Sequence, residues 1–472
     1  MSKSWVNFAE RLGSDLHLEL TGTGSRRAAL AEALRTAIQD GRLAPGTGLP
    51  PYRSLAADLG VARNTVAATY SELVAEGWLT ARQGSGTRVA ERSAPLSRPR
   101  TPGRPTTTPA APEHNLLQGQ PDASAFPRKA WATSTRRALT GAPNSAFGPG
   151  DPQGRLELRT ALANYLARAR GVRAEPEHIV ICAGFSDALR LLFGGGVLRG
   201  TLAVEAYGLA FHRALLASTG VATVPLGLDE HGSRTSELDD HDEVRSALLT
   251  PAHQFPVGGP LDPVRRHAAV EWARRRGGTV IEDDYDGEFR YDREPVGAVQ
   301  ALDPDHVVYV GSASKSLSPA LRLGWMVLPE SLVDAVLEVK GRRERWTGVV
   351  DQLTFADLIA SGAYDRHVRQ MRQRYRARRN RLAAALAERA PHIEPTGIAA
   401  GLHAVLRLPP GTEASTVEAA AAQGIALDGL AGYRHPDAAT AFDGLAVGYA
   451  APSDPALAPA LAALCRILPP RP

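Results

Sequence analysis

The chain has 472 residues, of which 43% are hydrophobic and 22% charged, and its formal net charge is +4. This length exceeds one ordinary hydrophobic core, so two or more globular domains are expected. No apolar run is long enough to cross a membrane, the N-terminus lacks a signal-peptide pattern, and Cys182 and Cys465 have neither metal-site nor disulfide spacing. Membrane, secreted and metal-binding classes are therefore disfavoured, and a cytoplasmic location is expected.

The N-terminal part of the chain carries the charge excess and a regular helical pattern. Residues 1–114 hold 14 Lys and Arg against 10 Asp and Glu, which permits a nucleic-acid role without establishing one. Residues 26–41 predict an amphipathic helix, and residues 51–79 predict two short helices joined by a turn at Gly60, which is helix-turn-helix spacing. Residues 79–89 then predict two strands around a Gly-Ser-Gly tip, a wing that can contact phosphates. The alternative is a small solvated helical domain.

Specific strings in this region resemble the GntR-type winged helix. They are GRLAPGTGLP, LAADLGV-ARNTV, Y-ELVAEGW and RQGSGT, spread over residues 41–87. The resemblance implies that the module binds a double-stranded DNA operator, and that its contacts are Arg53, Arg63, Asn64, Thr65, Gln83, Gly84, Ser85 and Gly86. One departure is Ala62, which stands where the family usually has a serine that could cap the recognition helix.

A linker separates this module from a larger domain. Residues 91–114 contain six prolines and four arginines and few large apolar side chains, which is typical of an extended tether. Downstream, strand-like and helical runs alternate, which predicts an α/β domain with a mostly parallel sheet. We expect a DNA-binding domain in residues 1–90, the linker in 91–114, and the larger domain in 115–472, with a small C-terminal subdomain from about residue 345. The predicted strands are 178–184, 201–206, 245–251, 278–284 and 306–312.

One lysine of the larger domain stands out, because only four of the 54 basic residues are lysines. An amine can act as a nucleophile, whereas a guanidinium is always protonated. Lys315 follows a strand-like run, lies among serines, and precedes an arginine-bearing apolar run in SASKSLSPALRLGWM. Taken alone, it could equally be a solvated loop charge.

Three other segments supply chemistry that suits such an amine. In TVIEDDYDGEFRYDR a strand ends in carboxylates and a tyrosine, a place where a cofactor's cationic nitrogen can be held. Asp284, Asp286 and Glu288 of that segment are interpreted as polar loop residues. In CAGFSDALRLLF a strand turns into a helix whose first N–H groups can cup a phosphate. The third segment, TPAHQFPVGG, is an unusual loop after a strand.

Together these segments provide the equipment for pyridoxal 5′-phosphate. The strings GDPQG-LELR-ALA-YLARARGV, TPAHQFPVG, IEDDYDGEFRYDR and S-SKSLSPALRLG-M resemble the MocR subfamily of regulators, in which a GntR-type winged helix is tethered to a fold-type-I aminotransferase-like domain. The resemblance implies that Lys315 forms the internal aldimine, that Asp283 holds the pyridine nitrogen, and that Tyr285 lies near O3′. It further implies a phosphate site of Gly184, Phe185, Ser186, Ser312 and Arg322, with His253 and Gln254 flanking the ring and the effector space.

The resemblance also implies a homodimer that pairs head to tail. The chain departs from the family pattern at several positions. The tyrosine that often reaches a neighbour's phosphate is absent, and Phe147 lies nearby in the sequence. The tyrosine and arginine that contact the effector in relatives sensing 4-aminobutyrate align with Leu209 and Phe211, which argues against such an effector being bound at those positions. Arg434 is a candidate for binding an anionic effector, and the alternative is a surface arginine. The arginine-rich run 366–382 has apolar residues at helical spacing, which favours a solvated helix face over a nucleic-acid patch.

Three functions follow from these observations. The leading one is a DNA-binding transcriptional regulator that senses an amino compound or pyridoxal phosphate through the Lys315 aldimine, and that is not an enzyme beyond a residual half-transamination. The second is an active aminotransferase with an appended DNA-binding domain. The third is a regulator of vitamin B6 homeostasis, for which pyridoxal phosphate itself is the signal.

Overall fold

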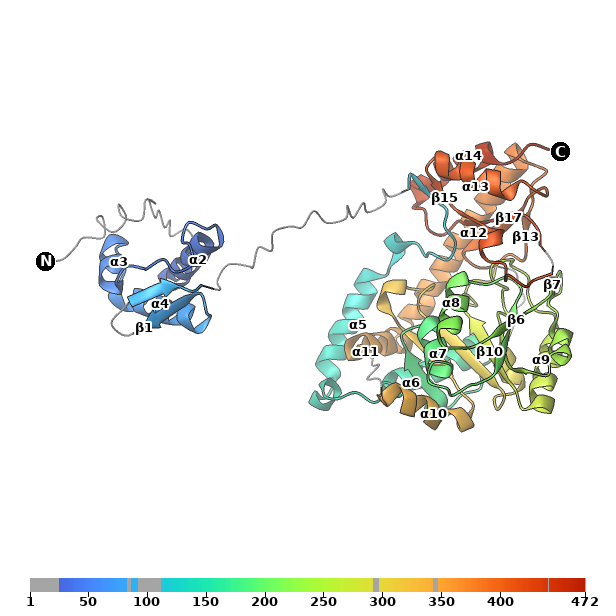
Figure 1. Ribbon diagram of the computed structural model, residues 1–472, viewed down its shortest axis with the longest axis horizontal. Helices are drawn as coiled ribbons and strands as arrows, with labels where there is room; N and C mark the ends of the chain where they lie inside the picture. Colours follow the sequence, from blue (N-terminus) through green and yellow to red (C-terminus); the bar gives the residue numbers. More distant parts are fainter. Residues whose placement is uncertain are drawn as a thin grey trace. The chain divides into compact units, whose positions relative to one another are not determined.

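The computed structural model describes residues 25–82, 86–91, 112–291, 297–342, 347–439 and 441–471, in two compact units that divide between Ala110 and Ala111 (Figure 1). Most of the predicted linker, residues 92–111, lies outside the described residues. Its last residue, His114, belongs to the second unit, because β3 (His114–Asn115) pairs in parallel with β15 (Ile425–Ala426). In the described part of the chain, no helix is both long and apolar enough to cross a membrane.

The first unit is a small helical domain with a two-stranded wing. Leu34, Val66 and Leu73 are fully or almost fully buried and hold its helices around one core. The turn between the second and third helices contains Gly60 at φ +62°, a left-handed conformation that favours glycine. The expected helix-turn-helix and wing are thus present as α2 (Arg26–Gln39), α3 (Tyr52–Asp58), α4 (Arg63–Ala75), β1 (Leu79–Arg82) and β2 (Gly86–Val89).

A seven-stranded sheet forms the centre of the second unit. Its strand order is β4-β12-β11-β10-β9-β5-β6, and every neighbouring pair is parallel except those of β12, which is antiparallel to β11 and β4. All five predicted strands are confirmed, and β6 and β12 join them. The strands are β4 (Ile179–Cys182), β5 (Thr201–Glu205), β6 (Thr223–Leu226), β9 (Val244–Leu249), β10 (Thr279–Asp284), β11 (Val307–Ser312) and β12 (Gly324–Val327).

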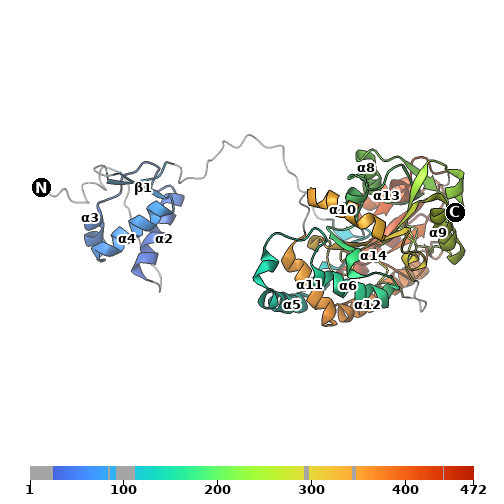
Figure 2. The same cartoon turned by 90° about the horizontal axis from the view of Figure 1, so that it is seen from below.

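Helices cover both faces of this sheet (Figures 1 and 2). Successive side chains of a strand point to opposite faces, so Ile181 and Trp325 pack into one apolar cluster while Val180 and Met326 pack into another. The first cluster includes α6 (Leu156–Arg170) and α11 (Val349–Ala360), and α5 (Arg128–Gly141) packs on α11. The second cluster includes α7 (Phe185–Leu192) and α10 (Glu330–Arg342), and α8 (Ala210–Ser218) packs beside α7. The helix α9 (Pro263–Arg276) belongs to a third apolar cluster.

The C-terminal part of the chain adds a smaller antiparallel sheet of order β13-β14-β17-β16. The helix predicted around residues 366–382 is present, and its apolar residues Val368, Met371, Tyr375 and Leu382 are buried as their spacing predicts. This part contains β13 (Pro395–Thr396), β14 (His403–Arg407), β16 (Asp428–Gly429), β17 (Gly444–Gly448), α12 (Ala363–Arg389), α13 (Glu413–Ala422) and α14 (Asp454–Ile467). A hairpin of β7 (Leu228–Asp229) and β8 (Gly232–Ser233) lies apart from both sheets.

Candidate functional site

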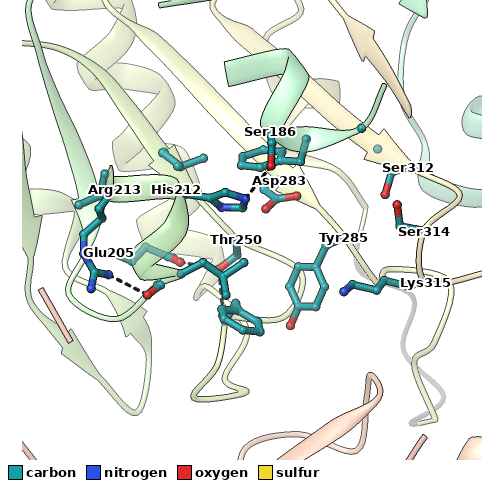
Figure 3. A pocket seen from close by; sticks show the side chains of 18 of the residues that line it. Ser186, Glu205, His212, Arg213, Thr250, Asp283, Tyr285, Ser312, Ser314 and Lys315 are labelled. Atoms are coloured by element: carbon teal, nitrogen blue, oxygen red, sulfur yellow. Dashed lines mark hydrogen bonds between the residues drawn. The ribbon is translucent and has the colours of Figure 1, made fainter. Parts of the chain in front are cut away.

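A cavity of about 280 Å³ lies at the carboxyl ends of β5, β9, β10 and β11, where parallel α/β sheets commonly bind ligands (Figure 3). Each of these strands contributes a lining residue at or just beyond its end, namely Glu205, Thr250, Asp283 and Ser312. The structure brings eight of the predicted cofactor residues together in the cavity wall: Gly184, Phe185, Ser186, Asp283, Tyr285, Ser312, Lys315 and Arg322.

Lys315 lies three residues after the end of β11 and lines the cavity. Its Nζ donates a hydrogen bond to the main-chain carbonyl of Gly119, with an N···O distance of 2.5 Å. Burial lowers the pKa of Lys315, while the carboxylates of Asp286 and Asp283 act in the opposite direction. A buried amine with a lowered pKa is more readily deprotonated, which is what a nucleophilic lysine requires.

Asp283 is the last but one residue of β10, and its carboxylate faces the cavity. Burial raises the pKa of Asp283 well above its ordinary value, Asp284 adds to the rise, and Lys315 opposes it. In the described part of the chain no side chain or main-chain group donates a hydrogen bond to this carboxylate, so a protonated nitrogen in the cavity would give it the partner it lacks.

The Tyr285 phenol is held by the loop that follows β9. Nδ1 of His253 lies 2.9 Å from the Tyr285 hydroxyl and 2.8 Å from Oδ2 of Asp286. His253 thus sits behind Tyr285 and is not among the residues that line the cavity. Because its ring is buried and shared between a phenol and a carboxylate, it fixes where the Tyr285 hydroxyl points.

The structure corrects the interpretation of the carboxylates at and after the end of β10 as polar loop residues, because they are buried. Asp284, Asp286 and Glu288 are at most 9% exposed. Nε of Arg170 lies 2.6 Å from the Asp284 carboxylate, which also accepts from the Tyr309 hydroxyl at 2.6 Å. The cation that such crowded carboxylates require is therefore present in the protein itself, at the end of α6.

The turn into α7 forms a recess suited to an anion. Gly184 caps the helix at φ +99° without a side-chain hydrogen bond, and the first N–H groups of the helix have no partner within it. Nη1 of Arg322 lies 3.8 Å from where a Cβ on Gly184 would stand. Main-chain N–H groups, the hydroxyls of Ser186 and Ser312, and a guanidinium thus share one end of the cavity.

Two predicted effector residues lie outside the cavity wall. Gln254 is buried, and its amide donates to the Glu205 carboxylate and to the carbonyls of Tyr207 and Phe255, so its hydrogens are already engaged. Arg434 is not a lining residue, and its main chain forms a bridge with Tyr207. Neither side chain lines this cavity in the structure.

The cavity also contains residues that sequence reasoning missed. Glu205, His212 and Arg213 lie on or after β5, and Gln118 lies before α5. Burial, with Lys315 as a second cause, lowers the pKa of His212 to about 4, so its ring is neutral near pH 7. The position of residues 205–213 after a parallel strand was a usable signal, because such strand ends meet at one edge of the sheet. Nothing in the sequence marks Gln118.

The predicted DNA-contacting residues lie at the start of α4 and near it. Arg53, Arg63 and Asn64 are exposed, Thr65 is half-buried, and the Arg63 guanidinium lies 5.1 Å from the centre of the Tyr52 ring. Gly86 begins β2, whereas residues 83–85, which include the predicted contacts Gln83, Gly84 and Ser85, lie outside the described residues. The N-cap of α4, Ala62, makes no side-chain hydrogen bond, as its missing hydroxyl predicts.

Comparison with known proteins assigns each of the two units to a protein family. Residues 26–89 match the family model for bacterial regulatory proteins of the gntR family, and residues 113–431 match that for aminotransferase class I and II. The pyridoxine biosynthesis transcriptional regulator PdxR of Corynebacterium glutamicum is 33% identical over 379 residues, which cover 80% of this chain and 82% of PdxR. The protein named MocR of Rhizobium meliloti is 34% identical over 379 residues, 76% of each chain.

The larger domain also has the fold of solved aminotransferases. An archaeal alanine:glyoxylate aminotransferase superimposes with a TM-score of 0.68 at 23% identity, over 75% of this chain and 90% of that one. At this identity the similarity shows the fold alone. Both family models agree with these relatives, which match over most of their length. The chain therefore belongs to the MocR subfamily of GntR-type transcriptional regulators, which join a winged helix to an aminotransferase-like domain.

Proposed function

We propose that this regulator holds pyridoxal 5′-phosphate in the cavity of its larger domain and adjusts its DNA binding to the chemical state of that site. The observation that carries the proposal is the donor set around one cavity: the Lys315 amine, the unpartnered Asp283 carboxylate and the recess before α7. An aldehyde, a pyridine nitrogen and a phosphate are the three groups that these residues suit. We further propose a DNA-binding domain in residues 1–90 and a larger domain that includes β3 (His114–Asn115) and runs to residue 472, so that the expected start at residue 115 moves to include His114. We also propose that the protein is cytoplasmic.

Each side chain has a separate task in this proposal. Lys315 binds the cofactor covalently, Asp283 accepts a hydrogen bond from the ring nitrogen, and the Tyr285 hydroxyl, positioned by His253, lies near O3′. Gly184, Phe185, Ser186, Ser312 and Arg322 bind the phosphate. When bound, pyridoxal phosphate supplies an electrophilic carbon that primary amines attack, and this makes the site a detector of amino compounds.

A short segment supports communication between the site and the linker. Whenever the Lys315 amine is not joined to the cofactor, it would be able to donate to the carbonyl of Gly119, as it does in this structure. Gly119 lies only a few residues after β3, where the chain enters the larger domain from the linker. Whether the Lys315 amine is bonded to the Gly119 carbonyl thereby affects the segment that leads to the DNA-binding module.

We also propose that the larger domain forms a homodimer. The side chains of Leu139, Phe147 and Leu156 are 45–53% exposed. They belong to α5, to the turn after it and to α6, and they are exposed apolar side chains of the kind that a contact between protomers would bury.

The cofactor assignment is tested by reductive trapping. Purified protein mixed with pyridoxal phosphate is treated with borohydride, digested and analysed by mass spectrometry. We expect the added mass on the peptide that contains Lys315 and none in Lys315→Ala. The matched control is Lys129→Ala, because Lys129 is exposed on α5 and should leave labelling at Lys315 unchanged. Labelling elsewhere with Lys315 unmodified would overturn the proposal.

A second candidate function is regulation by pyridoxal phosphate itself. It is favoured by the similarity to PdxR, whose name assigns it to pyridoxine biosynthesis. The two candidates differ in what changes DNA affinity. A change caused by the cofactor alone supports the second candidate, whereas a change that requires an added amine supports the first. Steady conversion of amino acids and keto acids over many turnovers would instead indicate an aminotransferase.

A further inference from the structure

The cavity wall contains a second guanidinium that the proposed cofactor site does not use. Arg213 lies in the first turns of α8 and is half-buried. Figure 3 shows it at the opposite end of the labelled side chains from Lys315, with His212, Thr250 and Tyr285 between them. Arg322, by contrast, lies beside Gly184 at the recess assigned to the phosphate. The two guanidinium groups therefore belong to different parts of the cavity.

Within the described residues, main-chain carbonyls are the partners of the Arg213 guanidinium, and no carboxylate is paired with it. Its Nη1 donates to the carbonyls of Gly208 at 2.7 Å and Tyr433 at 2.9 Å, and its Nη2 donates to the carbonyl of Arg434 at 3.1 Å. No Asp or Glu of the described residues forms an ion pair with it. Burial accordingly lowers the pKa of Arg213 with no carboxylate to oppose the effect. A half-desolvated cation without a partner is costly, and an anion in the cavity would offset that cost.

The same bonds fix the guanidinium and leave part of it unused. Three of its five N–H groups are taken by main-chain carbonyls, so Nε–H and one Nη2–H remain without a partner in the described part of the chain. Two donors are what a carboxylate needs for a two-point contact. The carbonyls come from Gly208 in the loop after β5 and from residues 433–434 outside the cavity wall, so two separate segments hold the arginine in place.

We propose that Arg213 binds the acidic group of the effector, which makes the effector an amino acid whose carboxylate is separated from the amine that reacts at Lys315. This inference rests on the proposed cofactor at Lys315 and adds the effector's chemical class. It assigns anion recognition to Arg213, whereas sequence reasoning placed the candidate at Arg434. A neutral His212 next to Arg213 adds no competing positive charge at pH 7.

The test compares unbranched amino acids of increasing chain length with alkyl amines of the same length. Each is titrated into the cofactor-loaded full-length protein, and the change in visible absorbance gives its apparent affinity. In the wild type we expect at least one amino acid to bind more tightly than its matched amine, by about tenfold to a hundredfold, the usual worth of a hydrogen-bonded charge pair. In Arg213→Gln this preference should disappear, while the alkyl amines bind as they do to the wild type.

Two controls separate failure of this inference from failure of the cofactor proposal. Arg434→Gln removes a neighbouring guanidinium that does not line the cavity, and it should keep the preference. Unchanged absorbance and amine binding in Arg213→Gln show that the domain remains folded. The inference is overturned if wild type does not prefer amino acids over amines, if Arg213→Gln retains the preference, or if no compound changes the spectrum. A protein that acquires no cofactor absorbance at all contradicts the proposed function as well.

Discussion

Gly119 is a residue at which the backbone conformation and the nearby Lys315 amine both disfavour a side chain. Its φ of +73° lies in the left-handed region, and a Cβ there would stand 2.9 Å from Nζ of Lys315. The carbonyl of the same residue accepts the hydrogen bond from Lys315. Close approach between this backbone and the lysine thus depends on glycine.

We therefore predict that Gly119→Ala disturbs the Lys315 site. The left-handed backbone alone should cost about 1–2 kcal/mol of stability, and the displaced amine should lower the fraction of protein that acquires cofactor absorbance. Gly259→Ala is the matched control, because no atom lies within 4 Å of its added Cβ and its φ is not positive. If both variants load cofactor equally well, Gly119 has no special role in the site.

Glu288 gives a second prediction at this scale. Burial, with Asp284 as the next cause, raises the pKa of Glu288 from 4.5 to about 7. Between these values the folded state binds more protons than the unfolded chain, so the free energy of unfolding falls as the pH rises through this window. Glu288→Gln should make that fall shallower, by up to about 3 kcal/mol over the window. Denaturant titrations at several pH values measure it, and Glu388→Gln, an exposed change on α12, should leave the slope unaltered.

The residue types of the cofactor site could be predicted, but their supporting contacts could not. Asp283 lies at the end of a strand that the alternating pattern predicted, and Tyr285 and Lys315 follow such ends. The structure brings all three to one cavity. His253 and Gln254 come from the same kind of segment, yet they face inward and bind Tyr285 and Glu205. Which way a loop side chain turns depends on tertiary partners, and no local periodicity encodes them.

At the scale of elements, the recognition helix α4 begins without a side-chain cap. Ala62 leaves the first N–H groups of α4 to solvent, whereas Ser25 caps α2 by accepting from the N–H of Ala28 at 3.3 Å. The two helices of one small domain thus differ in whether a side chain caps their N-terminal N–H groups. The start of α4 is also where Arg63 and Asn64 are exposed for the proposed DNA contacts.

We predict that Ala62→Ser stabilises the start of α4 by about 1 kcal/mol, because the new hydroxyl can accept from an N–H of the first turn. Slower hydrogen exchange of the α4 amides in the full-length protein would show it. Ser25→Ala should have the opposite effect on α2, by a similar amount. Equal exchange rates in the wild type and Ala62→Ser would mean that another group already satisfies this helix end.

At the scale of the whole molecule, arginine-rich segments occur in both units, and only one unit is expected to contact DNA. On α12 the side chains of Arg369, Arg376 and Arg381 are exposed and have no hydrogen bond or ion pair with the described residues. The apolar face of the same helix is buried, so these arginines form its solvated side. Alternation of strands and helices predicted the architecture because each element must bury one face. The apolar spacing of residues 366–382 predicted the solvated side of α12 for the same reason.

The salt dependence of DNA binding distinguishes the two sets of arginines. Removing an arginine that neutralises one phosphate should reduce the slope of log affinity against log salt concentration by about 0.9. We expect this reduction for Arg53→Gln and for Arg63→Gln, because each would lose a guanidinium that contacts a phosphate. We expect no change in slope when Arg369, Arg376 and Arg381 are all replaced by glutamine. Binding of one operator fragment is measured over a salt series for all variants. A smaller slope in the triple variant would show that α12 also binds the DNA backbone, and an unchanged slope in both winged-helix variants would place the phosphate-binding residues outside α3 and α4.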